Sequence, residues 1–591
     1  MVRLLPSVFN LFSHERTMLR TIVLLLVFVL VLNSGNVPAG GTSLVSGAFL
    51  VNGTPLGNAE TNAAPAKTAE ASAAGFDTLV LSPKKFQRSL KRWVEYRIGQ
   101  GHEVAVVSPA ASALGIKRQI REFAKTSPLK HVLIVGDAGD ARSGATDLVA
   151  TDYVASKVTV KFGSEPEIAT DNTYADLDSD GIPDLTIGRL PVDTSEELEK
   201  LTARIIKYES EANNESWRRR INLVAGVGGF GQVIDGLIEQ TTKQIVTDLV
   251  PSGYQTKMTY GSWRSPYCPD PRRFSKETIA RFNEGCMFWV YIGHGNRDRL
   301  DKIYMPDQSH RILDNSTVTK LNCQSGNPIA IFLACYTGAT DHSEDCLAEK
   351  MLNQDNGPIA VVSGTRVTMP YAMSLLSLEM VHEFFNGEVK TLGELMLVSK
   401  ARMVNGSDNN KEYRQMIEGM GKTFSPIAGM LKEERLEHVD LIHLIGDPLL
   451  RLKRPAKIKV NAADEAIAGD KLIVSGNADA AGELTVELAY RRDRFRRRPP
   501  RRKEYDSSEA SFKLYQETYE QTQNLVCATQ KIAVSAGEFK TELTVPADAI
   551  GKCVVRAMLV SEKGFGLGSK PVEIKKASAM RSAEKIERQI K

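Results

Sequence analysis

The chain has 591 residues, and its 75 lysines and arginines nearly balance its 71 aspartates and glutamates, so the formal net charge is only +4. This balance argues against an enzyme that binds nucleic acid through a basic surface. With 42% apolar residues, a chain of this length has enough material for three or four domains, each with its own core.

The amino-terminal segment has the pattern of a targeting signal. Arg16 and Arg20 precede an unbroken apolar run from Ile22 to Leu32, and small and polar residues follow. This run is too short to span a bilayer comfortably. We therefore predict a signal peptide over residues 1–39, cleaved after Ala39, and a protein that is secreted or held at the cell surface. An uncleaved membrane anchor is the alternative.

Residues 40–74 are predicted to be a low-complexity linker or short pro-segment, because most of this stretch is rich in Ala, Thr, Glu and Asn without apolar periodicity. Strands and helices alternate after it. A strand at Phe76 leads into a helix, and a second strand follows at Val104–Val107; the helix has one apolar face, formed by Phe86, Leu90, Trp93 and Val94. This βαβ pattern predicts a first α/β subdomain over residues 75–215, with a parallel sheet covered by helices.

An acidic loop lies within this first subdomain, with the sequence DLDSDGIPD. Its carboxylates are spaced as in loops that bind a hard cation, so we predict a structural calcium site. The twelfth position of an EF-hand would be Ile187, so the loop is not a full EF-hand, and an acidic surface turn is the alternative. The predicted metal ligands are Asp176, Asp178, Asp180 and Asp184.

Two short motifs in the next part of the chain carry the chemistry. YIGHG ends an apolar run at His294, and FLACYTG ends another at Cys335. Each run predicts a buried strand that delivers its reactive side chain at the carboxyl edge of a sheet. A thiol is mostly protonated at neutral pH, so an imidazole beside it is needed to take the proton. We predict that His294 and Cys335 are catalytic and that the amides of Gly295 and Cys335 hold the oxyanion; a buried core cysteine is the alternative.

These motifs resemble those of the caspase-like cysteine peptidases, and more closely those of the gingipain family. The resemblance covers roughly residues 75–455 and includes the segments 132–137, 183–192, 293–295, 334–338, 346–349, 357–365 and 444–449. It implies a caspase-like catalytic unit of two βα subdomains with parallel sheets, the second over residues 216–454, and endopeptidase activity on proteins or peptides. Gingipains cut after Arg or Lys, but we do not carry this preference over, because Asp235 and Glu239 align only loosely with the acid it requires.

The acid that would orient His294 is less evident. In gingipains it follows a strand that corresponds to Leu223–Gly226, and the matching position here is Val227. Asp184 and Asp171 are the substitutes that we consider. A Cys-His dyad without an acid is also feasible, because thiolate formation needs only the imidazole.

Residues 455–577 change to short alternating strands without long helices, which predicts an immunoglobulin-like β-sandwich. The resemblance implies the same, because a β domain follows the gingipain catalytic unit. Within it, Arg491–Lys503 is strongly basic and contains Pro499 and Pro500, so we expect an exposed loop that could contact an anionic surface; a merely solvated loop is the alternative. Residues 578–591 are predicted to be a charged tail.

Seven cysteines leave at least one unpaired, which a free Cys335 would explain; Cys527 and Cys553 could pair. No organic cofactor is expected, and without a CxxC pair or an HExxH motif no zinc site is predicted. The sequence therefore favours a secreted gingipain-like cysteine endopeptidase that acts through a thioacyl-enzyme. Two alternatives are a sortase-like surface transpeptidase and a catalytically degenerate, calcium-braced adhesion scaffold. The oligomeric state is left open.

Overall fold

The computed structural model describes residues 75–138, 148–210, 216–226, 246–425 and 427–577. The predicted signal peptide, linker and charged tail lie outside these residues, and so do Val227, Asp235 and Glu239. No helix in the described ranges is long and apolar enough to cross a bilayer.

A ten-stranded sheet runs through the described part of the catalytic region, in the order β2-β1-β3-β6-β16-β15-β14-β9-β7-β8. Its first half is parallel and consists of β1 (Thr78–Leu81), β2 (Val104–Val107), β3 (His131–Val135), β6 (Thr186–Leu190) and β16 (Ile442–Ile445). Its second half is also parallel and consists of β7 (Arg220–Ala225), β8 (Gln255–Tyr260), β9 (Phe288–Ile292), β14 (Ile329–Leu333) and β15 (Ala360–Gly364).

The two halves meet where β15 pairs with β16 in the antiparallel sense. This corrects the prediction of two separate sheets, because β16 belongs to the second half of the chain yet pairs with β6 of the first. Mixed α/β architecture with extensive parallel pairing is confirmed. The antiparallel seam means that the two halves present their carboxyl ends on opposite edges of one sheet.

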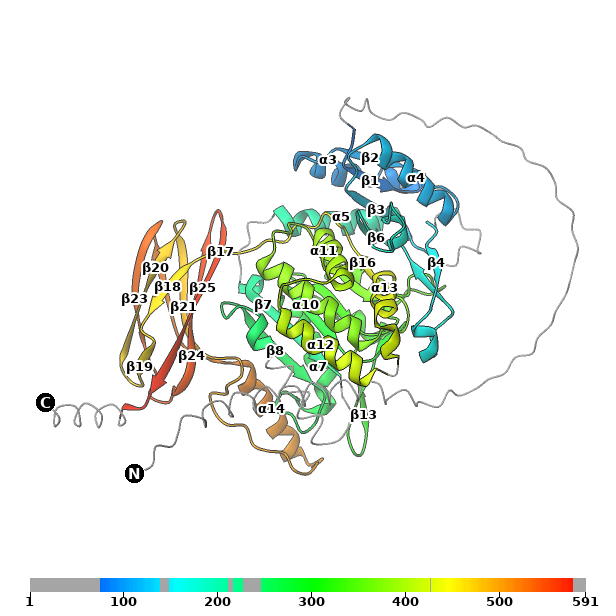
Figure 1. The fold of residues 1–591 in the computed structure, drawn as a ribbon. Coiled ribbons are helices and arrows are strands. Elements are labelled where there is room, and N and C mark those ends of the chain that lie inside the picture. The colour runs from blue at the N-terminus through cyan, green and yellow to red at the C-terminus, as the bar shows by residue number, and fades with distance from the viewer. Residues whose placement is uncertain (1–74, 139–147, 211–215, 227–245, 426, 578–591) are drawn as a thin grey trace, which may run out of the picture.

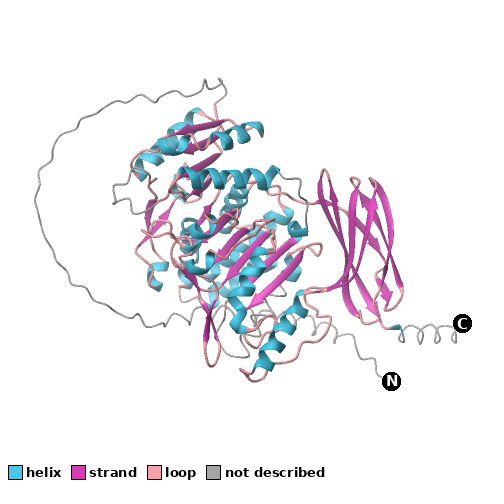
Figure 2. Ribbon diagram, turned by 180° about the vertical axis from the view of Figure 1, so that it is seen from behind, coloured by secondary structure: helices cyan, strands magenta, loops and turns pink. Residues whose placement is uncertain are grey.

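Helices cover both faces of this sheet (Figure 2). The helices are α2 (Lys84–Gln87), α3 (Lys91–Gly99), α4 (Ala113–Thr126), α5 (Ser195–Ser210), α7 (Phe274–Asn283), α8 (Asn315–Val318), α9 (Leu347–Leu352), α10 (Pro370–Asn386), α11 (Leu392–Asn405), α12 (Lys411–Phe424) and α13 (Leu431–Leu441). Ser112 caps α4, and Thr391 forms a capping box with Glu394 at the start of α11. The predicted apolar helix is divided between α2 and α3, and its Phe86, Leu90 and Trp93 are fully buried.

Short elements connect the main ones. Three hairpins pair β4 (Asp152–Ala155) with β5 (Glu167–Thr170), β10 (Gly295–Asn296) with β11 (Arg299–Leu300), and β12 (Lys302–Tyr304) with β13 (Ser309–Arg311). Single 3-10 turns, within the same described ranges, are η3 (Thr159–Phe162), η4 (Asn172–Tyr174), η5 (Ser216–Arg219), η6 (Pro271–Arg273) and η7 (Ala428–Met430).

The carboxy-terminal strands form a separate lobe of two sheets (Figure 1). The larger sheet contains β17 (Ala456–Lys457), β19 (Glu465–Ile467), β21 (Gly482–Tyr490), β22 (Val526–Val534), β24 (Gly551–Ser561) and β25 (Gly564–Lys575), and the smaller contains β18 (Lys459–Ala462), β20 (Lys471–Ala478) and β23 (Gly537–Thr544). Alternate residues of both sheets, such as Val474 and Val486, fill one shared core. The immunoglobulin-like assignment of this domain stays a prediction. Its Cys527 and Cys553 are free thiols in the structure.

The prediction that this region lacks long helices is wrong, because α14 (Glu509–Gln523) leaves the β lobe between β21 and β22. Its Phe512, Tyr515 and Tyr519 are buried at helical spacing. The Tyr519 and Thr259 hydroxyls lie 2.8 Å apart, so α14 packs on the catalytic region. Ser508 caps the helix, a local signal that the run of strands on either side obscured.

The arginine-rich segment is only partly the exposed loop that was expected. Arg492 donates hydrogen bonds to the carbonyls of Pro251 and Tyr254, both at 2.6 Å, and burial lowers its pKa to about 9. Arg502 donates to the Ser265 carbonyl at 2.5 Å and stacks 3.7 Å from the Tyr515 ring. These two side chains attach the loop to the catalytic region. The exposed cations are Arg494, Arg496, Arg497, Arg498, Arg501 and Lys503.

Candidate active site

The two reactive motifs follow adjacent parallel strands at the same offset. Ile292, the last residue of β9, pairs with Leu333, the last residue of β14. His294 and Cys335 each come two residues later, so the sheet itself brings both to one carboxyl edge. The side chains at such an edge lie in the loops, where substrate can reach them.

Glycines allow the two loops to touch. A β-carbon at Gly295 would lie 2.7 Å from the Cys335 carbonyl oxygen and 2.8 Å from the Thr337 methyl group, so only glycine fits there. Gly293 has φ +154° and would place a β-carbon 2.7 Å from the Tyr291 hydroxyl. That hydroxyl donates to the His294 carbonyl at 2.8 Å, which fixes the backbone of the histidine loop.

The thiol of Cys335 lies against Thr368, in the loop between β15 and α10. The Thr368 amide donates to Sγ at 3.4 Å, and its hydroxyl and carbonyl oxygens lie at 3.7 and 3.8 Å. Burial raises the pKa of the Cys335 thiol, while the hydrogen bonds from Thr368 act in the opposite direction. The net effect is a raised pKa, so the thiol needs a proton acceptor at neutral pH.

The His294 side chain is exposed. In the described part of the chain it makes no hydrogen bond to Cys335 or to a carboxylate. Catalytic hydrogen bonds are often long in a substrate-free enzyme, so this geometry leaves room for the pair to close on substrate.

Neither substitute acid contacts His294 in the described residues. Both oxygens of Asp171 are bound by Arg189, at 2.7 and 2.8 Å, and Thr151 donates a further bond. Asp171 is therefore half of a buried ion pair that braces β6, and its described partners are Arg189 and Thr151 rather than His294. Asp184 accepts a bond from the Leu177 amide at 2.8 Å, within the acidic loop. Neither Asp171 nor Asp184 is therefore placed to orient His294 in the described residues.

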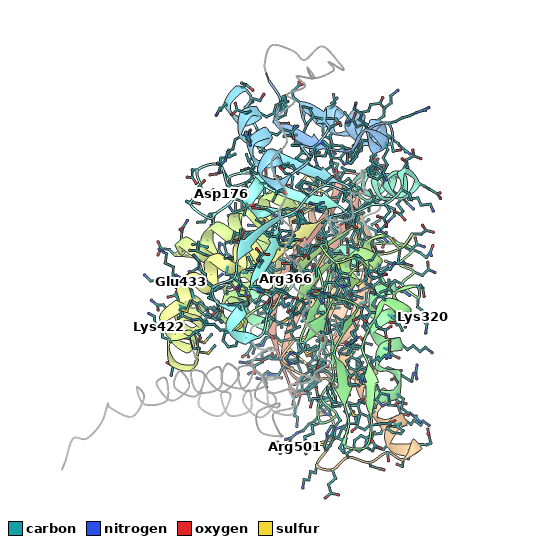
Figure 3. The ribbon with its side chains drawn as sticks, turned by 90° about the vertical axis from the view of Figure 1, so that its right-hand side faces the viewer. Asp176, Lys320, Arg366, Lys422, Glu433 and Arg501 are labelled. Carbon is teal, nitrogen blue, oxygen red and sulfur yellow. The ribbon has the colours of Figure 1, made fainter. Side chains whose placement is uncertain are left out.

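A charged cluster holds Tyr336, the residue after Cys335. The sequence did not indicate this cluster. Tyr336 has φ +58°, a strained conformation for a bulky residue, and its hydroxyl donates to Glu165 at 2.9 Å. Arg297 donates to the other Glu165 oxygen at 2.5 Å. Arg366 lies 3.6 Å from Glu165 and pairs with both oxygens of Asp341, at 2.9 and 2.6 Å. Arg366 is buried, and it is labelled near the middle of the view in Figure 3.

This cluster joins both halves of the sequence at the site. Tyr336 lies within the second motif and Arg297 two residues after the first, so both could have been suspected from their positions. Glu165 comes from the loop before β5, more than a hundred residues earlier, and has no local signal. Thr368 was also missed, since it lies just after the motif at 357–365 and has no local signal of its own.

The acidic loop has a donor set that suits calcium. Oxygens of Asp176, Asp178 and Asp180 lie within 4.8 Å of one another, and Asp184 is not part of this group. Ser179 and Gly181 adopt left-handed backbone at φ 68° and 87°, which turns the carboxylates inward. Burial and the like charges of Asp180 and Asp178 raise the pKa of Asp176, a repulsion that a cation would relieve. Asp176 lies at the surface of the molecule in Figure 3.

A parallel sheet that delivers a histidine and a cysteine to one edge defines the chain as a candidate cysteine peptidase. A sequence profile of peptidase family C25 matches residues 71–453, well over half of the chain. The chain belongs to peptidase family C25, which confirms the resemblance to the gingipains.

Lys-gingipain of Porphyromonas gingivalis is 21% identical over 299 residues, covering 49% of this chain and 15% of that protein. Lys-gingipain HG66 of the same species matches to the same extent. The chain thus matches only about a seventh of the length of these relatives.

Two solved structures are similar in fold. The Arg-specific cysteine proteinase gingipain R is 17% identical, with 86% of this chain and 99% of that chain covered and a TM-score of 0.48. A complex of the RgpB pro- and mature domains from Porphyromonas gingivalis is also 17% identical, with 84% and 100% covered and a TM-score of 0.46.

Proposed function

We propose that this chain is a secreted cysteine endopeptidase that hydrolyses peptide bonds through Cys335, with His294 as proton acceptor. The observation that carries the proposal is the close approach of the two motifs at Gly295, where the histidine and cysteine loops from adjacent strands leave no room for a β-carbon. Membership of a peptidase family adds protein or peptide substrates.

His294 takes the proton from the thiol, and the thiolate attacks the peptide carbonyl carbon to form a tetrahedral adduct. The amides of Gly295 and Cys335 donate to the negatively charged oxygen. Collapse of the adduct breaks the C–N bond, and the amine leaves with the proton from His294. Water, deprotonated by His294, then attacks the thioester, and the acid product leaves as the thiolate is restored.

The test is incubation of the purified chain with a mixed peptide library in calcium and reductant, with products read by mass spectrometry. Cys335→Ala and His294→Ala are run beside it, and Cys553→Ala is the control for loss of an unrelated thiol. We expect cleavage by the parent and by Cys553→Ala, and at least a thousandfold loss in the other two variants.

Two outcomes would replace this proposal. Ligated products that form when an amine is added, at the expense of hydrolysis, would identify a transpeptidase. No cleavage, together with no labelling of Cys335 by a peptide acylating probe, would identify a catalytically degenerate scaffold.

We further propose that Asp176, Asp178 and Asp180 bind a structural calcium ion. The cation would neutralise three converging carboxylates in a loop that Arg121 already holds, through a 2.8 Å hydrogen bond to Ser179. We expect the midpoint of thermal unfolding to rise by several degrees in millimolar calcium. Asp178→Asn with Asp180→Asn should abolish this rise, whereas Asp184→Asn, outside the group, should retain it; a rise that survives the double substitution would disprove the site.

Secretion and surface attachment rest on the amino-terminal sequence pattern and remain part of the proposal. The exposed cations between Arg494 and Lys503 are proposed to contact an anionic surface, because Arg492 and Arg502 attach the loop to the catalytic region while these cations stay exposed to solvent. Binding to anionic vesicles that weakens with salt would support this contact.

A further inference from the structure

A second group of potential metal ligands lies at the amino-terminal ends of the first three strands. Asp77 and His102 come just before β1 and β2, and His131 is the first residue of β3. Because these strands are adjacent and parallel, the three residues gather at one edge of the sheet. They lie in the first half of the catalytic region and share no residue with the cysteine loop or the acidic loop.

The ligand atoms have the spacing of a metal site. One atom each from Asp77, His102 and His131 lie within 4.8 Å of one another. Asp77 Oδ2 and His102 Nδ1 are 3.0 Å apart. Two ligands on tetrahedral zinc are about 3.3 Å apart, so a slight opening of this pair would accept the ion. The imidazoles of His102 and His131 meet edge to face, with centroids 5.5 Å apart.

Neighbouring groups orient two of the three ligands, His131 and Asp77, as the surroundings of metal sites do. Thr186 Oγ1 lies 2.8 Å from His131 Nδ1, which leaves Nε2 as the atom that His131 can offer. Thr78 Oγ1 and the Glu103 amide donate to Asp77 Oδ1 at 2.8 and 3.2 Å, so that Oδ2 faces the histidines. Such outer hydrogen bonds fix ligand orientation and raise metal affinity.

The backbone around the group is rigid, and the group is open to solvent. The Lys130 and His131 amides donate to the Asp77 carbonyl at 2.8 and 3.0 Å. The His102 and Asp77 side chains are 18% and 24% exposed, whereas His131 is buried. A metal ion could therefore enter from one side and keep a water molecule on its remaining position.

We propose that Asp77, His102 and His131 bind a zinc ion, with water as the fourth ligand. Two imidazoles and one carboxylate suit zinc, whereas calcium prefers a set made only of oxygens. The ion would tie together the starts of three neighbouring strands. The sequence contains no recognisable zinc motif, because the ligands come from three separate strands and meet only in the fold.

The experiment uses the full chain with Cys335→Ala, so that zinc cannot bind at the proposed catalytic thiol, in saturating calcium and a phosphine reductant. Zinc is titrated by calorimetry, and the bound metal is counted by atomic emission. We expect one zinc ion per chain, with affinity at least tenfold weaker in His102→Ala and in Asp77→Asn. His342→Ala, which removes an exposed histidine elsewhere, is the matched control and should bind as the parent does.

Cobalt in place of zinc identifies the ligand atoms. We expect visible d–d bands without a thiolate charge-transfer band, since the site contains no sulfur. Circular dichroism checks the folding of each variant, and Asp77→Asn, which keeps the size of the side chain, decides the matter if His102→Ala unfolds. Parental affinity in Asp77→Asn, a thiolate band, or no stoichiometric binding would each overturn the proposal.

Discussion

At the scale of single residues, Cys335 is placed where its thiol is buried and its pKa is raised, so that the thiol is not ionised by its surroundings alone. Burial raises its pKa, and the amide of Thr368 offsets only part of this effect. His294 stands exposed on the neighbouring loop. We therefore expect that the thiolate forms when the His294 imidazole approaches the thiol. The rate at which small reagents alkylate Cys335 should then measure the interaction of the two side chains.

We predict the pH dependence of Cys335 alkylation in His294→Ala. Because burial raises the pKa of the folded thiol, only a small fraction of it is ionised at pH 7 without His294, and the alkylation rate should rise steadily with pH. The parent should react faster near neutrality. Mass spectrometry of the Cys335 peptide after brief iodoacetamide treatment measures both; equal rates in parent and variant at pH 7 would show that His294 does not act on the thiol.

At the scale of elements, the loop after β14 is held from outside its own segment. Glu165 accepts hydrogen bonds from Tyr336 and Arg297 and forms an ion pair with Arg366. Burial raises the pKa of Glu165, but the hydrogen bonds and the two cations outweigh it, and the net pKa is lowered. The carboxylate thus stays charged at neutral pH and stabilises the strained backbone at Tyr336.

We predict that Glu165→Gln lowers kcat by about tenfold with little change in KM, because the loop that carries Cys335 loses its charged anchor. Glu167→Gln, an exposed neighbour in the same segment, is the control and should behave as the parent. Steady-state kinetics on a peptide found in the library screen measures the effect. A change confined to KM would instead place Glu165 in substrate binding.

A second element, α13, carries the buried carboxyl of Glu434, which forms no ion pair among the described residues. Burial raises the pKa of Glu434 to about 7, and Glu437 adds to this, although the Ala372 amide donates to Glu434 at 3.1 Å. A folded pKa above the unfolded one means that the protonated carboxyl stabilises the fold. This contribution is complete below about pH 4.5 and is lost as the pH rises through 7.

Glu434→Gln should therefore gain stability relative to the parent as the pH rises from 4.5 to 7, by roughly 2 to 3 kcal/mol. Urea unfolding at several pH values measures this difference. Glu433→Gln, next to it on α13 but only half-buried, should show no such trend; Figure 3 labels Glu433. A difference that is independent of pH would contradict the raised pKa.

At the scale of the whole molecule, local sequence patterns predicted where strands lie in the chain, but not which distant strands pair with one another. His294 and Cys335 could be found because each ends an apolar run, and such runs fix strand positions without knowledge of the rest of the chain. The return of β16 to the first half of the sheet could not be found, since Ile442–Ile445 looks the same whichever strand it joins. Glu165 and the zinc ligands share this difficulty, because only the fold brings them together.

The β lobe is also attached to the catalytic region by contacts that no sequence pattern indicates. Glu487 on β21 accepts hydrogen bonds from Arg219, at 2.7 and 3.1 Å, and from Arg556 at 2.9 Å, and all three are buried. Met558, Phe565 and Leu567 of the lobe belong to the main apolar core. The lobe is thus part of one packed body, and its loss would expose apolar surface of the catalytic region.

Glu487→Gln tests how strongly this junction holds. Burial raises the pKa of Glu487, but Arg556 and Arg219 outweigh it, so the net pKa is lowered and the contribution to stability is present above about pH 4.5. Without the charge, two buried arginines lose their counterion, and we expect a loss of about 3 to 5 kcal/mol at pH 7. Urea unfolding followed by tryptophan fluorescence measures it.

Glu483→Gln is the matched control, because Glu483 lies on the same strand but pairs with Lys531 in solvent, with both side chains more than half exposed. Its removal should cost less than about 1 kcal/mol. As the pH falls below 4, the difference between Glu487→Gln and the parent should shrink, since the parent then loses the same charge. Equal effects of the two substitutions at pH 7 would mean that the buried junction does not hold the lobe, and the apolar contacts at Phe565 and Leu567 would have to carry the attachment alone.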